Sequence, residues 1–213
     1  MIHSSVEDKL RHEYFELLPE IQIVAEELET RTRYAVLDVV VNREDYDLIA
    51  FKARVKECES AINAVRRRQE GKLFDDSLKD TYTLTSLRDL AGVRVLVFPS
   101  SKIDNIVTLL NETFDDWKSD PVQDDSDPPK LVAHKYFGYC HSSNRVMAEY
   151  QVVPMLIGQF WDVEHSALYK PAPQLEKIAR ELKMQQQKEK VYNALTEFVD
   201  EFEGILHEVS GDK

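Results

Sequence analysis

Glycine is scarce in this chain, and the few glycines stand far apart. The 213 residues contain six, namely Gly71, Gly92, Gly138, Gly158, Gly204 and Gly211. No two of them have the spacing of the GxGxxG or GxxxxGK[ST] loops, which hold phosphates with backbone amides. The P-loop, the Rossmann fingerprint and the glycine-rich loop of kinases are therefore excluded, and side chains must hold any bound nucleotide.

Cysteines and long apolar runs are also few. The two cysteines, Cys58 and Cys140, cannot build a disulfide framework or a four-ligand zinc site, which fits a reducing compartment. The first residues show no basic stretch followed by an apolar one, so we expect no signal peptide. No apolar run approaches the ~18 residues of a membrane span. We therefore expect a cytoplasmic protein with no membrane partner.

Acidic residues outnumber basic ones. The chain has 27 Lys and Arg against 39 Asp and Glu, a formal net charge of −12. Such a charge repels nucleic acid at long range but leaves room for one local basic pocket. A hydrophobic content of 43% is enough for a substantial core. We expect an N-terminal helical region (1–46), a core domain (47–171) and a C-terminal helical extension (172–213).

Helices and strands intermix along the sequence, which favours an α+β or α/β fold. Ser5 and Asp8 form a capping-box pattern, and Pro19 is expected to open a second helix. A brief helical turn is expected at Leu87–Leu90, ended by Gly92, and a helix is expected to be capped by Ser101. Strands are expected at 48–51, 93–98 and 145–153, and helices at 56–70 and from about 172 to 209.

The C-terminal helix carries apolar residues at alternating steps of four and three. These residues are Val191, Leu195, Phe198, Phe202, Ile205 and Val209. The pattern is equally typical of a helix that packs on its own core and of an oligomer interface. Both interpretations stay open from the sequence.

Two acidic positions stand next to buried strands. Asp89 precedes the apolar strand at 93–98, a suitable place for an oxygen ligand to Mg²⁺, although turn residues are commoner there. In Ala148–Val153, strand alternation places Glu149 and Gln151 on one face and apolar side chains on the other. Such a face is either the wall of a site or a solvated sheet surface.

Two further segments combine basic and aromatic residues. In Lys135–Tyr139, Gly138 permits a turn that would expose Tyr139 as a stacking platform for a base, with Lys135 near phosphate. Arg54 and Lys56 precede the run Arg66-Arg67-Arg68, a basic cluster worth testing as a phosphate site in so acidic a chain. Solvated surface charge is the ordinary explanation of either segment.

Taken together, the order and spacing of these pieces resemble the synthetase domain of the RelA/SpoT family, in its stand-alone small alarmone synthetase form. The resemblance runs from about 48 to 170. It rests on Arg54-x-Lys56-x-x-Glu59-Ser60, Asp89–Arg94, Lys135-x-x-Gly138-Tyr139, Glu149-x-Gln151 and Phe160-Trp161-x-x-Glu164-His165-x-x-x-Tyr169-Lys170. It implies a nucleotidyltransferase-like fold, a mixed β-sheet flanked by helices, and transfer of the β,γ-pyrophosphate of ATP to the 3′-hydroxyl of GDP or GTP.

The resemblance also implies roles for individual residues. Asp89 would hold Mg²⁺, and Glu149 would share that ion or take the proton of the attacking hydroxyl. Tyr139 would stack on guanine, and Lys135 would contact the acceptor's phosphates. The remaining substrate-binding positions are Arg54 against adenine, Lys56 on the ATP phosphates, and Gln151.

Five positions depart from the family's pattern, and polar contacts are lost with them. Ala64 replaces a phosphate-binding Lys, for which Arg67 and Arg68 are the candidate substitutes. Cys140 replaces a basic residue, Ser143 replaces His, and Val153-Pro154 stands for Arg-Thr.

These departures keep other functions open. The first is a toxic relative that pyrophosphorylates tRNA 3′ ends or adenosine nucleotides, with an antitoxin or tRNA as partner. The second is a catalytically degenerate nucleotide-binding module. The expected enzyme is a Mg²⁺-dependent GTP or GDP pyrophosphokinase that takes ATP and forms a homo-oligomer, with a tetramer as one candidate.

Overall fold

The computed structural model describes residues 5–69, 73–123, 131–164 and 184–211. Its centre is a mixed sheet with the strand order β1-β2-β6-β5-β3, and β4 pairs with β5 outside this order. The strands are β1 (Leu48–Val55), β2 (Ala91–Phe98), β3 (Lys118–Ser119), β4 (Val122–Gln123), β5 (Leu131–Tyr139) and β6 (Met147–Pro154). The β2–β6 pair is parallel and the other pairs are antiparallel. This is the α+β fold class that the sequence predicts.

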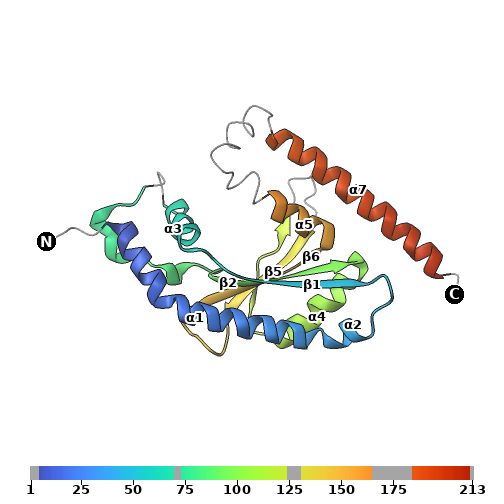
Figure 1. The fold of residues 1–213 in the computed structure, drawn as a ribbon, viewed down its shortest axis with the longest axis horizontal. Helices are drawn as coiled ribbons and strands as arrows, with labels where there is room; N and C mark the ends of the chain where they lie inside the picture. The colour runs from blue at the N-terminus through green and yellow to red at the C-terminus, as the bar shows by residue number, and fades with distance from the viewer. Residues whose placement is uncertain (1–4, 70–72, 124–130, 165–183, 212–213) are drawn as a thin grey trace.

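Helices cover both faces of the sheet (Figure 1). One face carries α1 (Val6–Ala35) and α4 (Ile103–Thr113), and the other carries α5 (Met155–Glu164) and α7 (Met184–Gly211). Shorter elements are α2 (Leu37–Val41), α3 (Cys58–Arg67) and the 3₁₀ turns Asp76–Thr81, Leu84–Ser86 and Ser100–Lys102. Within the described residues, no helix combines the length and apolar character that crossing a membrane requires.

Two apolar clusters lie on opposite faces of the sheet. The larger is buried under α1 and α4. Helix α4 and the residue that follows it contribute Ile103, Ile106, Val107, Leu110 and Phe114, which lie at helical spacing and are all buried. The smaller consists of Leu96, Ala133, Val153 and Ile157, with Tyr192 and Leu195 of α7 packed against it. This second cluster covers only part of its face, and the remainder is polar.

Helix α1 begins as predicted but does not stop at Pro19. Ser5 accepts a hydrogen bond from the backbone N–H of Asp8, and Asp8 accepts one from that of Ser5, which is the capping box. Pro19 lies inside the helix at an exposed position, so the expected second helix is wrong. Proline removes one intrahelical hydrogen bond, and at an exposed position water can satisfy the freed carbonyl. Buried Leu17 and Ile21 on either side hold the helix together.

Two other local expectations were wrong. The helical turn lies at Leu84–Ser86 rather than Leu87–Leu90, and Gly92 lies inside β2. Ser101 does not cap α4, because a 3₁₀ turn precedes the helix and its N-cap is Lys102, which makes no side-chain cap. The segment after Tyr34, rich in β-branched residues, forms the short helix α2. The β-strand propensity of these residues is a weak preference that depends on context, and here the chain continues directly from the end of α1 as a second helix.

Candidate active site

The polar part of the sheet is built by strand register. Arg54 of β1 pairs with Gly92 of β2, which pairs with Glu149 of β6. The next row joins Lys52, Arg94, Gln151 and Lys135 in the same way. Paired residues on neighbouring strands point to the same face, so these charged side chains gather on one surface.

This surface lines a cavity of about 220 Å³. Its walls are Lys52, Ala53, Arg54, Gly92, Val93, Arg94, Glu149, Gln151 and Asp162. Three of the sequence-predicted residues, Arg54, Glu149 and Gln151, are therefore brought together. The alternation predicted for 148–153 is confirmed, because Ala148, Tyr150 and Val152 are buried on the opposite face.

Helix α5 covers the sheet next to the cavity and so forms one of its boundaries. Leu96 and Val153, two residues further along the same face, are 1% and 0% exposed under this helix. A Cβ at Gly158 would lie 2.3 Å from Leu96 Cδ2 and 2.9 Å from Val153 Cγ1, so only glycine allows this approach. Beyond Gly158 the helix leaves the sheet open and places Asp162 at the cavity wall.

Glu149 is the most buried charged group of the cavity, with 9% of its surface exposed. Burial raises the pKa of Glu149, the nearby negative charge of Asp89 raises it further, and Arg54 and Lys135 oppose the shift. An Arg54 Nη2 lies 3.8 Å from Glu149 Oε1, and Gln151 Nε2 donates a 2.6 Å hydrogen bond to the same oxygen. The carboxylate is fixed in position and its charge is only partly compensated.

Asp89 lies in the loop before β2, held close to the end of β1. The N–H of Lys56 donates to the carbonyl of Leu90 at 2.8 Å, and Lys56 Nζ forms an ion pair with Asp89 Oδ2. The electrostatic effect of Asp89 on Glu149 places these two carboxylates in the same region. Lys56 and Asp89 thus extend the polar surface beyond the cavity wall.

Lys135 and Tyr139 belong to β5, so the expected turn at Gly138 is wrong. Lys135 pairs with Asp120 at 2.8 Å and lies beside Gln151 in the sheet. Tyr139 ends the strand with 42% of its surface exposed, and its carbonyl accepts a 3.2 Å hydrogen bond from Trp117 Nε1. Gly138 serves packing, because a Cβ there would lie 2.5 Å from Trp117 Cδ1.

Arg67 and Arg68 lie on and just after α3 and do not line the cavity. Arg68 Nη1 donates a 2.7 Å hydrogen bond to the carbonyl of Ser86. That contact ties the end of α3 to the segment before Asp89. Their expected role as substitutes for a lysine at Ala64 stays a prediction.

The other departures have structural explanations. Val153 belongs to the second core, and Cys140 is 4% exposed with its Sγ directed to the Val24 carbonyl of α1 at 4.0 Å. Ser143 is buried; its hydroxyl donates to Glu20 at 2.6 Å and accepts from the N–H groups of Arg145 and Val146. None of the three side chains lines the cavity.

Sequence reasoning assigned no role to three charged residues of the cavity wall, namely Lys52, Arg94 and Asp162. Arg94 carried a detectable signal, since it is the one charged residue in the apolar strand 93–98. Lys52 and Asp162 carried none, because their pairing at 2.5 Å joins residues 110 positions apart.

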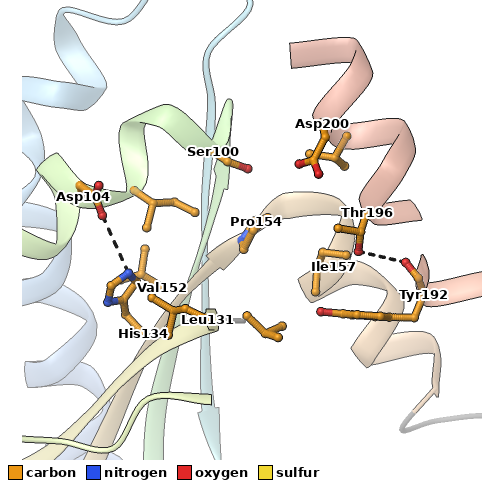
Figure 2. Close-up of a pocket in the computed structure, with 13 residues that line it drawn as sticks. Ser100, Asp104, Leu131, His134, Val152, Pro154, Ile157, Tyr192, Thr196 and Asp200 are labelled. Atoms are coloured by element: carbon orange, nitrogen blue, oxygen red, sulfur yellow. Dashed lines mark hydrogen bonds and ion pairs between the residues drawn. The ribbon is translucent and has the colours of Figure 1, made fainter. Parts of the chain in front are cut away.

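A second cavity, of about 260 Å³, lies between α7 and the far end of the sheet (Figure 2). Tyr192, Thr196 and Asp200 face it from α7, and Asp104 and His134 from the opposite side. His134 Nε2 lies 3.9 Å from Asp104 Oδ1, and burial lowers the pKa of His134. None of the sequence-predicted site residues lines this cavity.

The described residues contain no cluster of three or more His, Cys, Asp or Glu side chains that would hold a metal ion by themselves. A pair of carboxylates is nevertheless what Mg²⁺ uses when substrate phosphates and water complete its shell. Asp89 and the buried, incompletely neutralised Glu149 fit that requirement.

Comparison with solved structures identifies the fold. No protein-family model and no curated protein matches the sequence. Solved structures do match. The small alarmone synthetase 1 from Bacillus subtilis bound to AMPCPP has a TM-score of 0.62 and 16% identity, over 92% of this chain and 97% of that one.

Two further structures agree. The same synthetase bound to its product pppGpp gives a TM-score of 0.56 and 19% identity, over 91% and 96% of the two chains. The small alarmone synthetase 2 from Bacillus subtilis gives a TM-score of 0.57 and 21% identity, over 88% of this chain and 96% of that one. The chain therefore has an α+β synthetase fold, and specifically that of the small alarmone synthetases, which confirms the resemblance at the level of fold.

Proposed function

We propose that this protein is a Mg²⁺-dependent pyrophosphokinase that transfers the β,γ-pyrophosphate of ATP to the 3′-hydroxyl of GDP or GTP and so makes (p)ppGpp. The observation that carries the proposal is the buried Glu149 on a sheet surface lined by Arg54, Arg94 and Lys52. Pyrophosphoryl transfer needs positioning and charge neutralisation rather than a covalent nucleophile. Solved proteins of this fold bind AMPCPP and pppGpp.

In this reaction the oxygen of the 3′-hydroxyl bonds to the β-phosphorus of ATP, the bond to the α-phosphate oxygen breaks, and AMP leaves. Glu149 accepts the hydroxyl proton, a role favoured by a raised carboxylate pKa. Bound Mg²⁺, held by Asp89, would neutralise the phosphate charge, and sharing that ion is the alternative role of Glu149. Lys56 would exchange its ion pair with Asp89 for the ATP phosphates.

The acceptor would lie toward β5. Lys135 and Gln151 are neighbours across the β5–β6 pair, and exposed Tyr139 ends β5 on the same side of the strand as Lys135. In our proposal Lys135 contacts the acceptor's phosphates and Tyr139 stacks on guanine. Arg54, half exposed at the cavity, would lie against adenine.

Incubation with ATP, Mg²⁺ and one acceptor at a time tests the proposal. GDP and GTP should give 3′-pyrophosphorylated guanosine, and AMP, ADP and tRNA should not. A product from tRNA or an adenosine nucleotide instead would identify the toxic type of enzyme, and no product from any acceptor would reject transfer altogether.

Two isosteric variants test the carboxylates. Asp89→Asn and Glu149→Gln should each lower the rate by roughly 10²–10⁴-fold while the protein stays folded. Asp115→Asn is the matched control, because it makes the same charge change at an exposed position after α4. Full activity in either site variant would contradict the assigned roles.

A further inference from the structure

Arg88 lies directly before Asp89, in the loop that leads into β2, and its side chain reaches as far as β5. The Cζ atom of Arg88 lies 4.2 Å from the centre of the Phe137 ring. Because β6 lies between β2 and β5 in the sheet, the side chain passes over β6. Phe137 pairs with Glu149 across the β5–β6 ladder, so the ring and the guanidinium over it belong to the polar face of the sheet.

The neighbours of Phe137 on this face are the two residues proposed to bind the acceptor. Lys135 and Tyr139 stand two positions before and after Phe137 in β5, and alternate residues of a strand share a face. The proposed function places the acceptor's phosphates at Lys135 and its guanine at Tyr139. The Arg88 guanidinium therefore lies between the phosphate end and the base end of the acceptor.

Arg88 differs from the other cations of this surface in its partners. Each of the others forms an ion pair with a carboxylate, namely Lys52 and Arg94 with Asp162, Arg54 with Glu149, Lys56 with Asp89, and Lys135 with Asp120. Arg88 is exposed, and among the described residues no carboxylate forms an ion pair with it. An anionic ligand can therefore bind Arg88 without first displacing an internal carboxylate.

The contact with Phe137 prepares this guanidinium for a phosphate group. The aromatic ring covers one face of the planar group and leaves its N–H donors, which lie at the edges, available to a ligand. Those donors match two oxygens of one phosphate, a geometry that a lysine ammonium does not offer. Since the ring already holds the side chain in place, binding loses less conformational entropy than it would with a mobile arginine.

We propose that Arg88 binds the 5′-phosphate chain of the guanosine acceptor, so that the site selects guanosine 5′-di- and triphosphates over guanosine. This inference rests on the proposed function in taking a guanosine nucleotide as the acceptor. Arg88 is then a specificity-determining residue for the acceptor, whereas the adjacent Asp89 serves the ATP phosphates through Mg²⁺. Consecutive residues of one loop would thus act on the two substrates.

Isothermal titration calorimetry with GDP, guanosine and AMPCPP tests the inference without turnover. Arg88→Gln should weaken GDP binding roughly 10–100-fold, the loss expected for a charged hydrogen-bonding partner of phosphate. Guanosine and AMPCPP should bind the variant and the wild type equally. Arg88→Lys keeps the charge without the planar donor group, so it should recover only part of the GDP affinity.

Arg43→Gln is the matched control for the loss of one positive charge. Arg43 is exposed and precedes the start of β1, whereas Arg54 and the site lie near the end of that strand. This variant should bind GDP as the wild type does. Thermal unfolding checks that each variant is folded.

A double-mutant cycle tests the role of the aromatic ring. Phe137→Leu keeps an apolar side chain but removes the interaction with the guanidinium, so GDP binding should weaken roughly twofold to fivefold. This effect should disappear in the Arg88→Gln background, because the arginine that the ring holds is then absent. Equal effects of Phe137→Leu in both backgrounds would contradict the role assigned to the ring.

The remaining outcomes separate this inference from the proposed function. Unchanged GDP affinity in folded Arg88→Gln overturns the inference, as does an equal loss of guanosine binding or an equal effect of Arg43→Gln. If Arg88→Gln does not fold, wild-type GDP affinity in Arg88→Lys overturns it. A selective loss of GDP binding in a protein that makes no alarmone supports the inference and rejects the reaction. A wild-type protein that does not bind GDP rejects both.

Discussion

The side-chain amide of Gln151 joins Glu149 to Arg94, because it donates a 2.6 Å hydrogen bond to Glu149 Oε1 and accepts a 3.0 Å bond from Arg94 Nε. Both ends of the amide are used, so its orientation is set by opposite charges on its two sides. The chain of contacts continues through Arg94 to Asp162 on α5. A helix that covers the sheet is thus connected to the buried carboxylate by three successive contacts.

Glu149→Gln should remove a pH-dependent loss of stability. Burial raises the pKa of Glu149 above its unfolded value, so the folded state binds this proton more tightly. The free energy of unfolding then falls as pH rises from the unfolded pKa through the folded one. The variant should lack this fall and should be at least as stable as the wild type at neutral pH.

Urea unfolding of both proteins between about pH 4 and 8 measures this difference. Asp115→Asn, with its exposed position, should follow the wild-type curve. A Glu149→Gln protein that is less stable at neutral pH and has an unaltered pH slope would show that burial of the charge costs nothing here.

Gly138→Ala should destabilise the fold, whereas Gly204→Ala should stabilise it. A Cβ at Gly138 would lie 2.5–2.7 Å from three atoms of the Trp117 indole, and that tryptophan is 8% exposed and packs on Phe114 and Tyr150. Overpacking of this kind costs about 1–3 kcal/mol. Gly204 lies at an exposed position of helix α7 with nothing within 4 Å of an added Cβ, so alanine should increase the free energy of unfolding by about 0.5–1 kcal/mol.

Chemical denaturation of the two variants gives the comparison directly. The pair controls for the substitution itself, since both replace glycine by alanine. Equal effects in the two variants would contradict the close contact between β5 and Trp117.

Cys140 should not react with thiol reagents in the folded protein. Burial raises the pKa of its thiol to about 12, and only 4% of its surface is exposed. Below that pKa the thiol is protonated, and the thiolate is the reactive form. With dithionitrobenzoate at about pH 8, Cys140 should react only after unfolding, and Cys58→Ser isolates its signal. Rapid labelling of the folded Cys58→Ser protein would place Cys140 outside the core.

The sequence correctly predicts features that depend on residues close together in the chain, such as strand alternation and helix capping. The alternation in 148–153 correctly places Glu149 and Gln151 together, and the Ser5 capping box correctly starts α1. Pro19 is misleading because the free-energy cost of a proline inside a helix depends on whether water can reach the carbonyl that loses its hydrogen bond. A single sequence does not show that Pro19 is exposed.

Distant contacts account for the rest. Gly138 looks like a turn residue, yet the reason for glycine there is the Trp117 indole on another segment. Lys52 and Asp162 meet only because α5 crosses the sheet beyond Gly158. Local periodicity contains neither relationship, and the cavity wall was therefore only partly predictable.

The C-terminal helix divides its apolar residues between two environments. Leu195 packs against the second core and Val199 is 6% exposed, as expected of a helix on its own core. Four other residues remain exposed by 41–57%, namely Val191, Phe198, Phe202 and Ile205. The side chain of Val209 lies outside the described residues, as does the segment 172–183 of the predicted helix.

We expect this exposed row to form a homo-oligomer contact. The rings of Phe198 and Phe202 stack at 5.7 Å, and Phe202 stacks on Phe98 of the sheet at 5.9 Å, so the aromatic part of the row continues onto the sheet. Contiguous apolar surface of this kind marks interaction sites. Ile205→Asp should shift the protein toward the monomer in light scattering at micromolar concentration. Asn193→Asp is the matched control, since it adds the same charge at an exposed position of α7 outside the row. A wild-type monomer under these conditions would show that the row serves no self-association, and an oligomer that survives Ile205→Asp would place the contact on another surface.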